Sequence, residues 1–289
     1  MRRWQDVGLV LLAVSTAMLI WVAFRALGAV PVATPVLTAD LGVPSVTVDD
    51  AATSAPPDDA ELTGRPQTQD QPVPGPLEQA RAVLQREERT VVLVLGDSTG
   101  NDRGEWTYRW AEALAGSRPT FIAPWNEWTE DGYVEAEALA GNGSGGEGLG
   151  EILVLSGSQT GARAGYAAPR IELLTPEDPD LVILNLGHNN GVDDVTDGLQ
   201  ETVDALRSRV GDDVPVVVTL QQPQAGDQNA EVRQAVASWA QEQGLPTIDV
   251  ASRFLAEGQP EALLTDAVHP NDAGSALWAE VVADTLGAP

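Results

Sequence analysis

The chain has 289 residues, 43% of them hydrophobic, which is enough for one sizeable domain with additional segments. Its 43 acidic and 16 basic residues give a net charge of -27, which argues against nucleic acid and anionic lipid headgroups as partners, because both would be repelled. The absence of cysteine excludes disulfide bonds, thiolate metal sites and a cysteine nucleophile.

The N-terminus carries an uncharged apolar stretch, Val7 to Phe24, shortly after Arg2 and Arg3. Its 18 residues approach the ~20 that a helix needs to cross a bilayer, and the two arginines favour the cytoplasmic side. Residues 1–30 are therefore expected to form a signal anchor, or a signal peptide cleaved near Ala26–Ala29. The first alternative predicts a single-pass membrane protein with its functional domain outside the cytoplasm, and the second a secreted protein.

Residues 31–75 have the composition of a linker. They are rich in Pro, Thr, Ala, Asp and Gln and lack aromatic residues, so they cannot bury enough apolar surface to offset the entropy lost on ordering. We expect a disordered linker here, followed by the folded domain over residues 76–289.

The pattern of residues 76–289 predicts alternating strands and helices. A first helix is expected from Pro76, since Leu77, Ala80, Val83 and Leu84 recur at helical spacing. Continuous apolar runs, typical of parallel strands buried on both faces, follow at Val91–Leu95, Ile152–Leu155, Leu181–Leu186, Val214–Leu220 and, more weakly, Pro246–Val250. Helical patterns lie at Glu105–Ala115, Asp194–Val210, Ala230–Gln243 and Asn271–Leu286. This alternation predicts an α/β sandwich with a central parallel sheet of about five strands.

Four short clusters of reactive residues follow the expected strands: Gly96-Asp97-Ser98, Gly161, Gly187-His188-Asn189-Asn190 and Asp266-Ala267-Val268-His269-Pro270. They contain both histidines of the chain, His188 and His269. Because the carboxyl ends of parallel strands meet at one edge of a sheet, we expect the clusters to converge there, although the sequence spreads them widely.

The residue types suit nucleophilic catalysis by serine. The Ser98 hydroxyl needs a base to take its proton, and His269 is the candidate. Asp266, three residues earlier, would orient the imidazole and stabilise its charged form. The backbone N–H groups of Ser98 and Gly161 and the side-chain amide of Asn189 could together stabilise an oxyanion.

The clusters resemble the four sequence blocks of the SGNH, or GDSL, hydrolase family. The likeness spans about Thr90 to Gly287 and implies a flavodoxin-like three-layer α/β sandwich with a serine esterase activity. The second block is the least specific, and Gly157 is an alternative to Gly161 as its glycine. Asn190 departs from the family pattern, which usually has Asp at this position. A second departure is a long glycine-rich stretch before the second expected strand.

A rival motif and several neighbouring residues leave alternatives open. Residues 96–100 also fit G-x-S-x-G, the nucleophile elbow of α/β-hydrolases, but that fold puts several strands before the serine and usually separates its Asp and His. His188 is expected to be a neutral histidine packed beside the site. His188, Asn190, Trp125 and Trp128 are all candidates for substrate contacts, and the two tryptophans suggest stacking on sugar rings.

These observations predict an extracytoplasmic serine hydrolase that cleaves carboxylic esters through an acyl-enzyme. Short acyl or O-acetyl groups on envelope glycans or lipids are the expected substrates, and neither a metal nor a cofactor is needed. Two alternatives remain: an O-acyltransferase with the same triad, and a non-catalytic surface-binding module of the same fold. Membrane contact is expected through the N-terminal segment only, and the sequence does not predict an oligomeric state.

Overall fold

The computed structural model of the protein describes residues 74–141 and 148–287. The predictions made for residues 1–30, and for the linker as far as residue 73, lie outside the described residues. Within the described ranges, no helix combines the length and the apolar character needed to span a bilayer.

A seven-stranded sheet forms the centre of the fold, with the strand order β3-β2-β4-β1-β5-β6-β7. Six strands are parallel, and the short edge strand β3 is antiparallel to β2. The strands are β1 (Thr90–Gly96), β2 (Thr120–Pro124), β3 (Glu137–Ala138), β4 (Ile152–Ser158), β5 (Leu181–Asn185), β6 (Val216–Leu220) and β7 (Thr247–Asp249).

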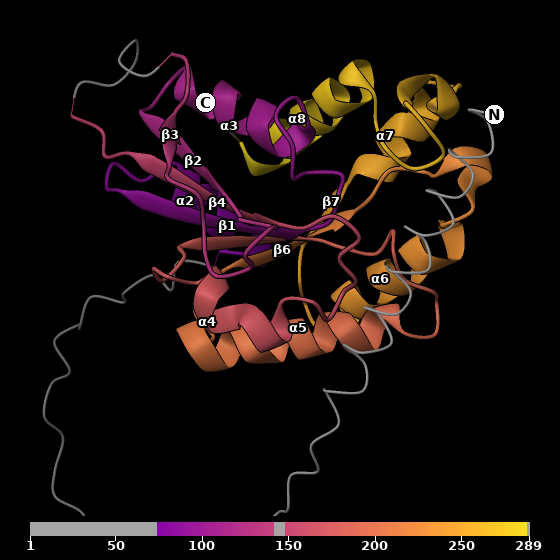
Figure 1. Cartoon of the computed structure of the whole chain (residues 1–289), viewed down its shortest axis with the longest axis horizontal. Coiled ribbons are helices and arrows are strands. Elements are labelled where there is room, and N and C mark those ends of the chain that lie inside the picture. Colours follow the sequence, from indigo (N-terminus) through magenta and orange to yellow (C-terminus); the bar gives the residue numbers. More distant parts are fainter. Residues whose placement is uncertain (1–73, 142–147, 288–289) are drawn as a thin grey trace, which may run out of the picture. The chain divides into compact units, whose positions relative to one another are not determined.

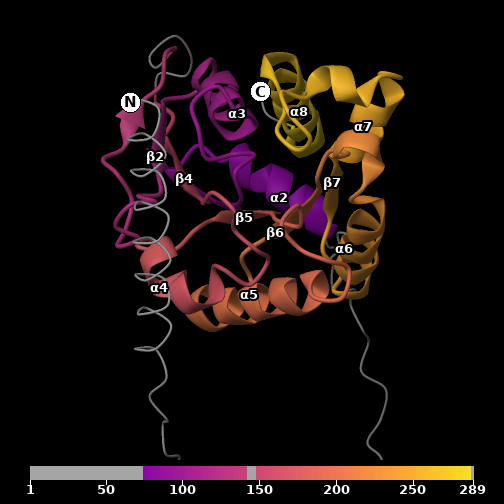
Figure 2. The same cartoon turned by 45° about the vertical axis from the view of Figure 1, so that its right-hand side comes forward.

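Helices cover both faces of this sheet, so the fold is a three-layer α/β sandwich. Figures 1 and 2 show α3, α7 and α8 on one face and α4, α5 and α6 on the other. The α-helices are α2 (Pro76–Leu84), α3 (Trp106–Ala115), α4 (Ile171–Leu174), α5 (Val195–Val210), α6 (Ala230–Glu242), α7 (Val250–Ala256) and α8 (Asp272–Leu286). Three short 3-10 helices complete the connections: η1 (Ala168–Arg170), η2 (Ala225–Asp227) and η3 (Pro260–Leu263).

Strand β1 shows why the apolar runs are continuous. All seven of its residues are buried. Val92 and Val94 point into the core beneath α2, α3, α7 and α8, whereas Val91, Leu93 and Leu95 point into the core beneath α4, α5 and α6. Since side chains alternate between the two faces of a strand, both faces of a central parallel strand must be apolar.

The five predicted strands are confirmed as β1, β4, β5, β6 and β7, and two further strands, β2 and β3, were not predicted. In β2, Thr120–Pro124, only Phe121–Ala123 form an unbroken apolar run, and the strand ends in proline. β3 has two residues, too few for a detectable alternation. Both lie at one edge of the sheet, so the order of the central strands is unaffected.

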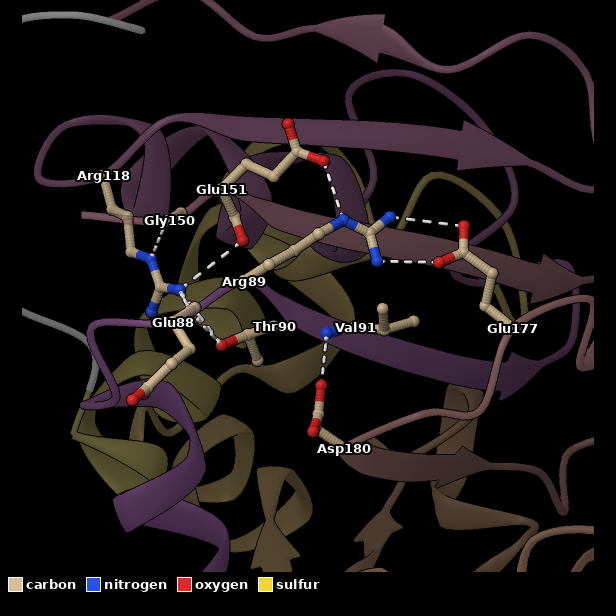
Figure 3. A network of polar contacts seen from close by, with 9 residues as sticks. All are labelled: Glu88, Arg89, Thr90, Val91, Arg118, Gly150, Glu151, Glu177 and Asp180. Atoms are coloured by element: carbon tan, nitrogen blue, oxygen red, sulfur yellow. Dashed lines mark hydrogen bonds and ion pairs between the residues drawn. The ribbon is translucent and has the colours of Figure 1, made fainter. Parts of the chain in front are cut away.

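Polar contacts hold the amino ends of the central strands (Figure 3). The backbone N–H of Val91 donates to Asp180 at 2.8 Å, which joins the start of β1 to the turn before β5. Arg89 pairs with Glu151 and Glu177 at 2.8 and 2.7 Å, and the buried Arg118 donates to several backbone carbonyl groups of the same edge. These contacts fix the amino ends of the strands relative to one another. The reactive clusters lie at the opposite, carboxyl ends, where the loops of the site begin.

Candidate active site

The four clusters converge at the carboxyl edge of the sheet. Ser98 follows β1, Gly161 follows β4 and Asn189 follows β5, while the segment from Asp266 to His269 connects η3 to α8. β1 lies between β4 and β5, so the loops that carry Ser98, Gly161 and Asn189 leave adjacent strands. The sheet therefore brings together side chains that are up to 171 residues apart in the chain.

Ser98, His269 and Asp266 form a continuous hydrogen-bonded chain. The Oγ atom of Ser98 lies 2.9 Å from Nε2 of His269, and Nδ1 of the same ring lies 2.8 Å from Oδ2 of Asp266. A carboxylate only accepts hydrogen bonds, so Nδ1 carries the proton and Nε2 presents its lone pair to the serine hydroxyl. This tautomer is the one in which His269 can accept a proton from Ser98.

The loop geometry holds Asp266 as a carboxylate. Its Oδ1 atom accepts hydrogen bonds from the backbone N–H groups of Val268 and His269, each at 2.8 Å. These two bonds, with the bond from the His269 ring, lower the pKa of Asp266 to about 2. The three-residue spacing from His269 thus has a local cause, because the turn that positions the imidazole also provides the donors that keep its partner charged.

Three donors predicted for an oxyanion hole line the same edge. Within the part of the chain that the structure describes, the backbone N–H groups of Ser98 and Gly161 have no hydrogen-bond partner. One hydrogen of the Asn189 amide is used, since Nδ2 donates to the carbonyl of Ala162 at 3.0 Å, and the second is left for a ligand. That bond fixes the amide between the loops after β4 and β5.

The two candidate glycines of the second block occupy different surroundings. Gly161 lies in the loop after β4 at φ +71°, a conformation that favours glycine, and a Cβ atom there would meet open space. Gly157 lies inside β4, where a Cβ atom would approach Leu174 and the Tyr133 hydroxyl at 2.9 Å. Gly157 therefore serves packing within the sheet, and Gly161 has the position that the oxyanion proposal requires.

A buried polar network supports the serine turn from below. Oδ1 of Asp97 accepts from the backbone N–H and the hydroxyl of Thr99 at 3.0 and 2.7 Å, and its Oδ2 accepts from Gln221 at 2.9 Å. Asn185, at the end of β5, donates to the Thr99 hydroxyl at 3.1 Å. Asp97 thus has the turn-holding contacts expected of a structural residue.

His188 lies in an amide cage. Its Nε2 atom is 2.8 Å from Oε1 of Gln222, and its Nδ1 atom is 3.0 Å from Nε2 of Gln224 and 3.3 Å from Nδ2 of Asn229. Burial lowers the pKa of this imidazole, which is therefore neutral at pH 7. Because both ring nitrogens are occupied, His188 serves the architecture of the site and has no free atom for a substrate.

The residues of the cage that follow β6 were missed by the sequence analysis. Gln221 accepts from the backbone N–H of His188 at 2.9 Å, and Gln222 donates from Nε2 to the carbonyl of Val268, the residue before His269. Glutamines after a strand match no catalytic sequence motif. Their role is visible only in the structure, where they contact both the His188 cluster and the His269 cluster.

The other residues predicted to contact substrate have distinct positions. Oδ1 of Asn190 accepts from the backbone N–H of Ala164 at 2.8 Å, and its amide donates to Asp194 at 3.2 Å, so it braces two loops. The Trp125 side chain is only 4% exposed and packs edge-on against Tyr133. Trp128, in contrast, is 97% exposed. Of these three side chains, Trp128 alone is fully available to a ligand.

A second carboxyl group, Glu105, lies near His269. Its Oε2 atom accepts from the backbone N–H of Asp102 at 2.8 Å at the start of α3. Burial raises its pKa to about 7, and the nearby His269 acts in the opposite direction.

No group of three His, Cys, Asp or Glu side chains within residues 74–141 and 148–287 is placed to hold a metal ion.

Comparison with known proteins agrees with this geometry. Residues 94–277 match the profile of the GDSL-like Lipase/Acylhydrolase family, and this range is more than half of the chain and contains all four clusters. The chain belongs to this family. It is therefore a carboxylic ester hydrolase. The α/β-hydrolase interpretation of residues 96–100 does not apply, because the strand before Ser98 is the first in sequence of the described strands, whereas that fold puts several strands before the serine. No curated protein matches the chain.

Solved structures of a GDSL-like lipase and of two esterases share the fold of this family member. A GDSL-like lipase from Parabacteroides merdae is 15% identical with a TM-score of 0.50, and the match covers 70% of this chain and 98% of that one. An acetylxylan esterase from Geobacillus stearothermophilus is 16% identical with a TM-score of 0.50, over 70% and 97% of the two chains. A two-domain esterase active on acetylated mannans is 16% identical with a TM-score of 0.51, over 73% and 51%. At these identities the likeness concerns the three-layer fold.

Proposed function

We propose that this esterase works through an acyl-enzyme formed on Ser98. The observation that carries the proposal is the hydrogen-bonded chain from Ser98 through His269 to Asp266. His269 Nε2 takes the hydroxyl proton as Oγ attacks the ester carbonyl, and the tetrahedral oxyanion accepts hydrogen bonds from Ser98, Gly161 and Asn189. The C–O bond to the alcohol then breaks, and the imidazolium returns its proton to the leaving oxygen.

Water completes the cycle on the acyl-enzyme. His269 accepts a proton from the water as its oxygen attacks the acyl carbon, and then gives that proton to Ser98 Oγ as the acid leaves. Asp266 stays ionised throughout, because its pKa is about 2. It stabilises the imidazolium that forms in both halves of the reaction.

Short acyl groups, such as O-acetyl, are the proposed acid portion of the substrate. The cavities beside the site carry charged side chains, including Asp102, Arg103 and Glu127 in one and Arg163 and Asp194 in another. A long acyl chain would have to desolvate such groups without pairing them, at a cost in free energy. These linings are better suited to a polar alcohol portion, such as a glycan.

We also propose an extracytoplasmic location, anchored or secreted. The support is the apolar stretch Val7–Phe24 behind Arg2 and Arg3. Fusions of alkaline phosphatase to the C-terminus test it, since the reporter folds to an active form only outside the cytoplasm. We expect the fusion to have phosphatase activity and to lose it when residues 1–30 are deleted. A fusion that accumulates stably in the cytoplasm without phosphatase activity would contradict the proposal.

The activity itself is tested on the full-length chain and its Ser98→Ala variant. Fluorophosphonate labelling and release of p-nitrophenol from acetate, butyrate and octanoate esters are measured together. We expect labelling and turnover to be lost in Ser98→Ala, and the acetate ester to be cleaved faster than the octanoate ester. A folded wild-type chain that neither labels nor turns over would remove the acyl-enzyme proposal and favour a binding module. Acyl transfer to an added sugar in preference to water would identify an acyltransferase.

A further inference from the structure

A groove of about 780 Å³ lies beside the segment that follows the serine turn, and its lining begins at Asn101. Asn101, Arg103 and Tyr108, on the segment that follows Ser98, contribute to its lining. Glu127 and Trp128, from the segment after β2, also line the groove, and the Asn101 amide donates to Oε1 of Glu127. Its volume falls in the range of roughly 300–1,000 Å³ that is usual for sites of small organic ligands.

The groove joins the proposed oxyanion loop directly. Its lining includes Thr160, the residue before Gly161. The Asn101 amide donates to the Thr160 hydroxyl at 2.9 Å, and the backbone N–H of Thr160 donates to Oε2 of Glu127 at 2.9 Å. The groove therefore begins one residue from Gly161, whose backbone N–H is one of the proposed oxyanion donors.

Trp128 lies at the tip of a firmly anchored hairpin. At the base, Trp125 forms an antiparallel bridge with Tyr133, whose hydroxyl donates to the carbonyl of Leu174 at 2.8 Å. Near the tip, the Asn126 side chain accepts from the backbone N–H of Trp128 at 3.2 Å. The hairpin thus fixes the backbone from which an almost fully exposed indole projects.

A further ion pair attaches the hairpin to the body of the domain. Glu130 pairs with Arg170 at 2.7 Å and accepts from the Gln159 amide at 3.1 Å. The anchored hairpin therefore presents the Trp128 indole, which is 97% exposed, as a flat apolar surface beside the groove.

The residues that line the groove indicate which class of ligand it can bind. An indole offers a flat apolar face for the C–H face of a pyranose ring, and amide and carboxylate groups offer partners for its hydroxyls. Asp102 provides a carboxylate, whereas the Glu127 carboxylate already accepts from the Asn101 amide and the Thr160 backbone N–H. The guanidinium of Arg103 is paired with Glu137 and lies over the Tyr108 ring. The free charge is negative, as in the chain as a whole, which disfavours an anionic sugar.

We propose that this groove is a subsite for a neutral oligosaccharide, stacked on Trp128, whose esterified hydroxyl is presented to Ser98. The inference rests on the proposed ester hydrolysis for the reaction, but the binding it describes does not require catalysis. It identifies the alcohol portion of the substrate as a neutral glycan chain.

Calorimetric titration of the full-length Ser98→Ala chain tests the binding alone. Xylohexaose, mannohexaose and cellohexaose are the neutral probes, and trigalacturonic acid is the anionic one. We expect at least one neutral hexaose to bind, with affinity lowered about three- to tenfold by adding Trp128→Ala and largely recovered by Trp128→Phe. Leu255→Ala, which removes an exposed apolar side chain from α7, is the matched control and should leave binding unchanged. No binding of any neutral hexaose, equal binding with Trp128→Ala, or preference for the anionic sugar would overturn the proposal.

Kinetics separate this inference from the proposed function. On an acetylated hexaose, Trp128→Ala should lower kcat/KM by at least about threefold more than it does on p-nitrophenyl acetate. Equal losses on both substrates would contradict the subsite. A wild-type chain that binds a neutral hexaose but cleaves neither ester would remove the esterase mechanism and leave the saccharide site intact.

Discussion

The side chain of Gln222 links His188 to the loop that bears the proposed catalytic base. Its Oε1 atom lies 2.8 Å from His188 Nε2, and its Nε2 atom donates to the carbonyl of Val268 at 2.6 Å. Since the amide must donate to Val268, its oxygen faces His188, whose Nε2 therefore carries the proton. One buried glutamine thus connects the loop of Asn189 to the loop of His269.

Replacing Gln222 by Leu should separate these loops. We expect kcat for p-nitrophenyl acetate to fall about 10- to 100-fold with a smaller change in KM, because the base is displaced relative to the oxyanion donors. Gln234→Leu, on the exposed face of α6, is the matched control. A Gln222→Leu chain with an unchanged melting temperature and wild-type kcat would contradict the positioning role.

The amide cage of His188 should make stability depend on pH. The folded-state pKa is lowered from 6.5, chiefly by burial, while the charge of Asp97 acts in the opposite direction. The stabilisation from the neutral ring is therefore fully present above pH 6.5 and is lost as the pH falls through the lowered pKa. Urea unfolding measures the free energy of unfolding of the wild type and of His188→Gln. The difference between the two chains should be about 1 kcal/mol larger at pH 7.5 than at pH 5.5. Parallel pH profiles of the two chains would argue against a neutral histidine held in the amide cage.

Replacing Asp266 by Asn should impair catalysis more than folding. An amide nitrogen facing Nδ1 would favour the wrong tautomer of His269, and the charge that stabilises the imidazolium would be gone. We expect kcat/KM to fall about 10²- to 10⁴-fold. Asp272→Asn, which changes an exposed carboxylate in α8, should retain wild-type kinetics. Activity of the Asp266 variant close to wild type would show that another group orients the imidazole.

Gly96 leaves room for a neighbouring strand. A Cβ atom there would lie 2.6 Å from Oγ of Ser158 on β4 and 3.5 Å from Cβ of Asn185 on β5. We expect Gly96→Ala to lower the free energy of unfolding by about 1–3 kcal/mol. Ser158→Ala removes the closest atom, so the double variant should recover part of the loss, as a double-mutant cycle by urea unfolding would measure. Strictly additive effects would show that the two side chains do not collide.

Local patterns in the sequence were sufficient for the fold class and for the proposed triad. The apolar runs predicted five of the seven strands, because a parallel strand buried on both faces cannot alternate. The Asp266–His269 pair could also be read from the sequence, since one turn contains both the ring and the donors that keep its partner ionised. Each of these features depends on residues that are close together in the chain.

Only the tertiary structure decided which neighbours serve the architecture and which face solvent. His188 and Trp128 were both candidates for substrate contact, yet one is enclosed by amides and the other is 97% exposed. The roles of Gln222 and Glu130 were likewise hidden, because each acts on partners at least 29 residues away. A sequence records residue types and local spacing, whereas burial and hydrogen-bond partners arise only when the sheet brings distant loops to one edge.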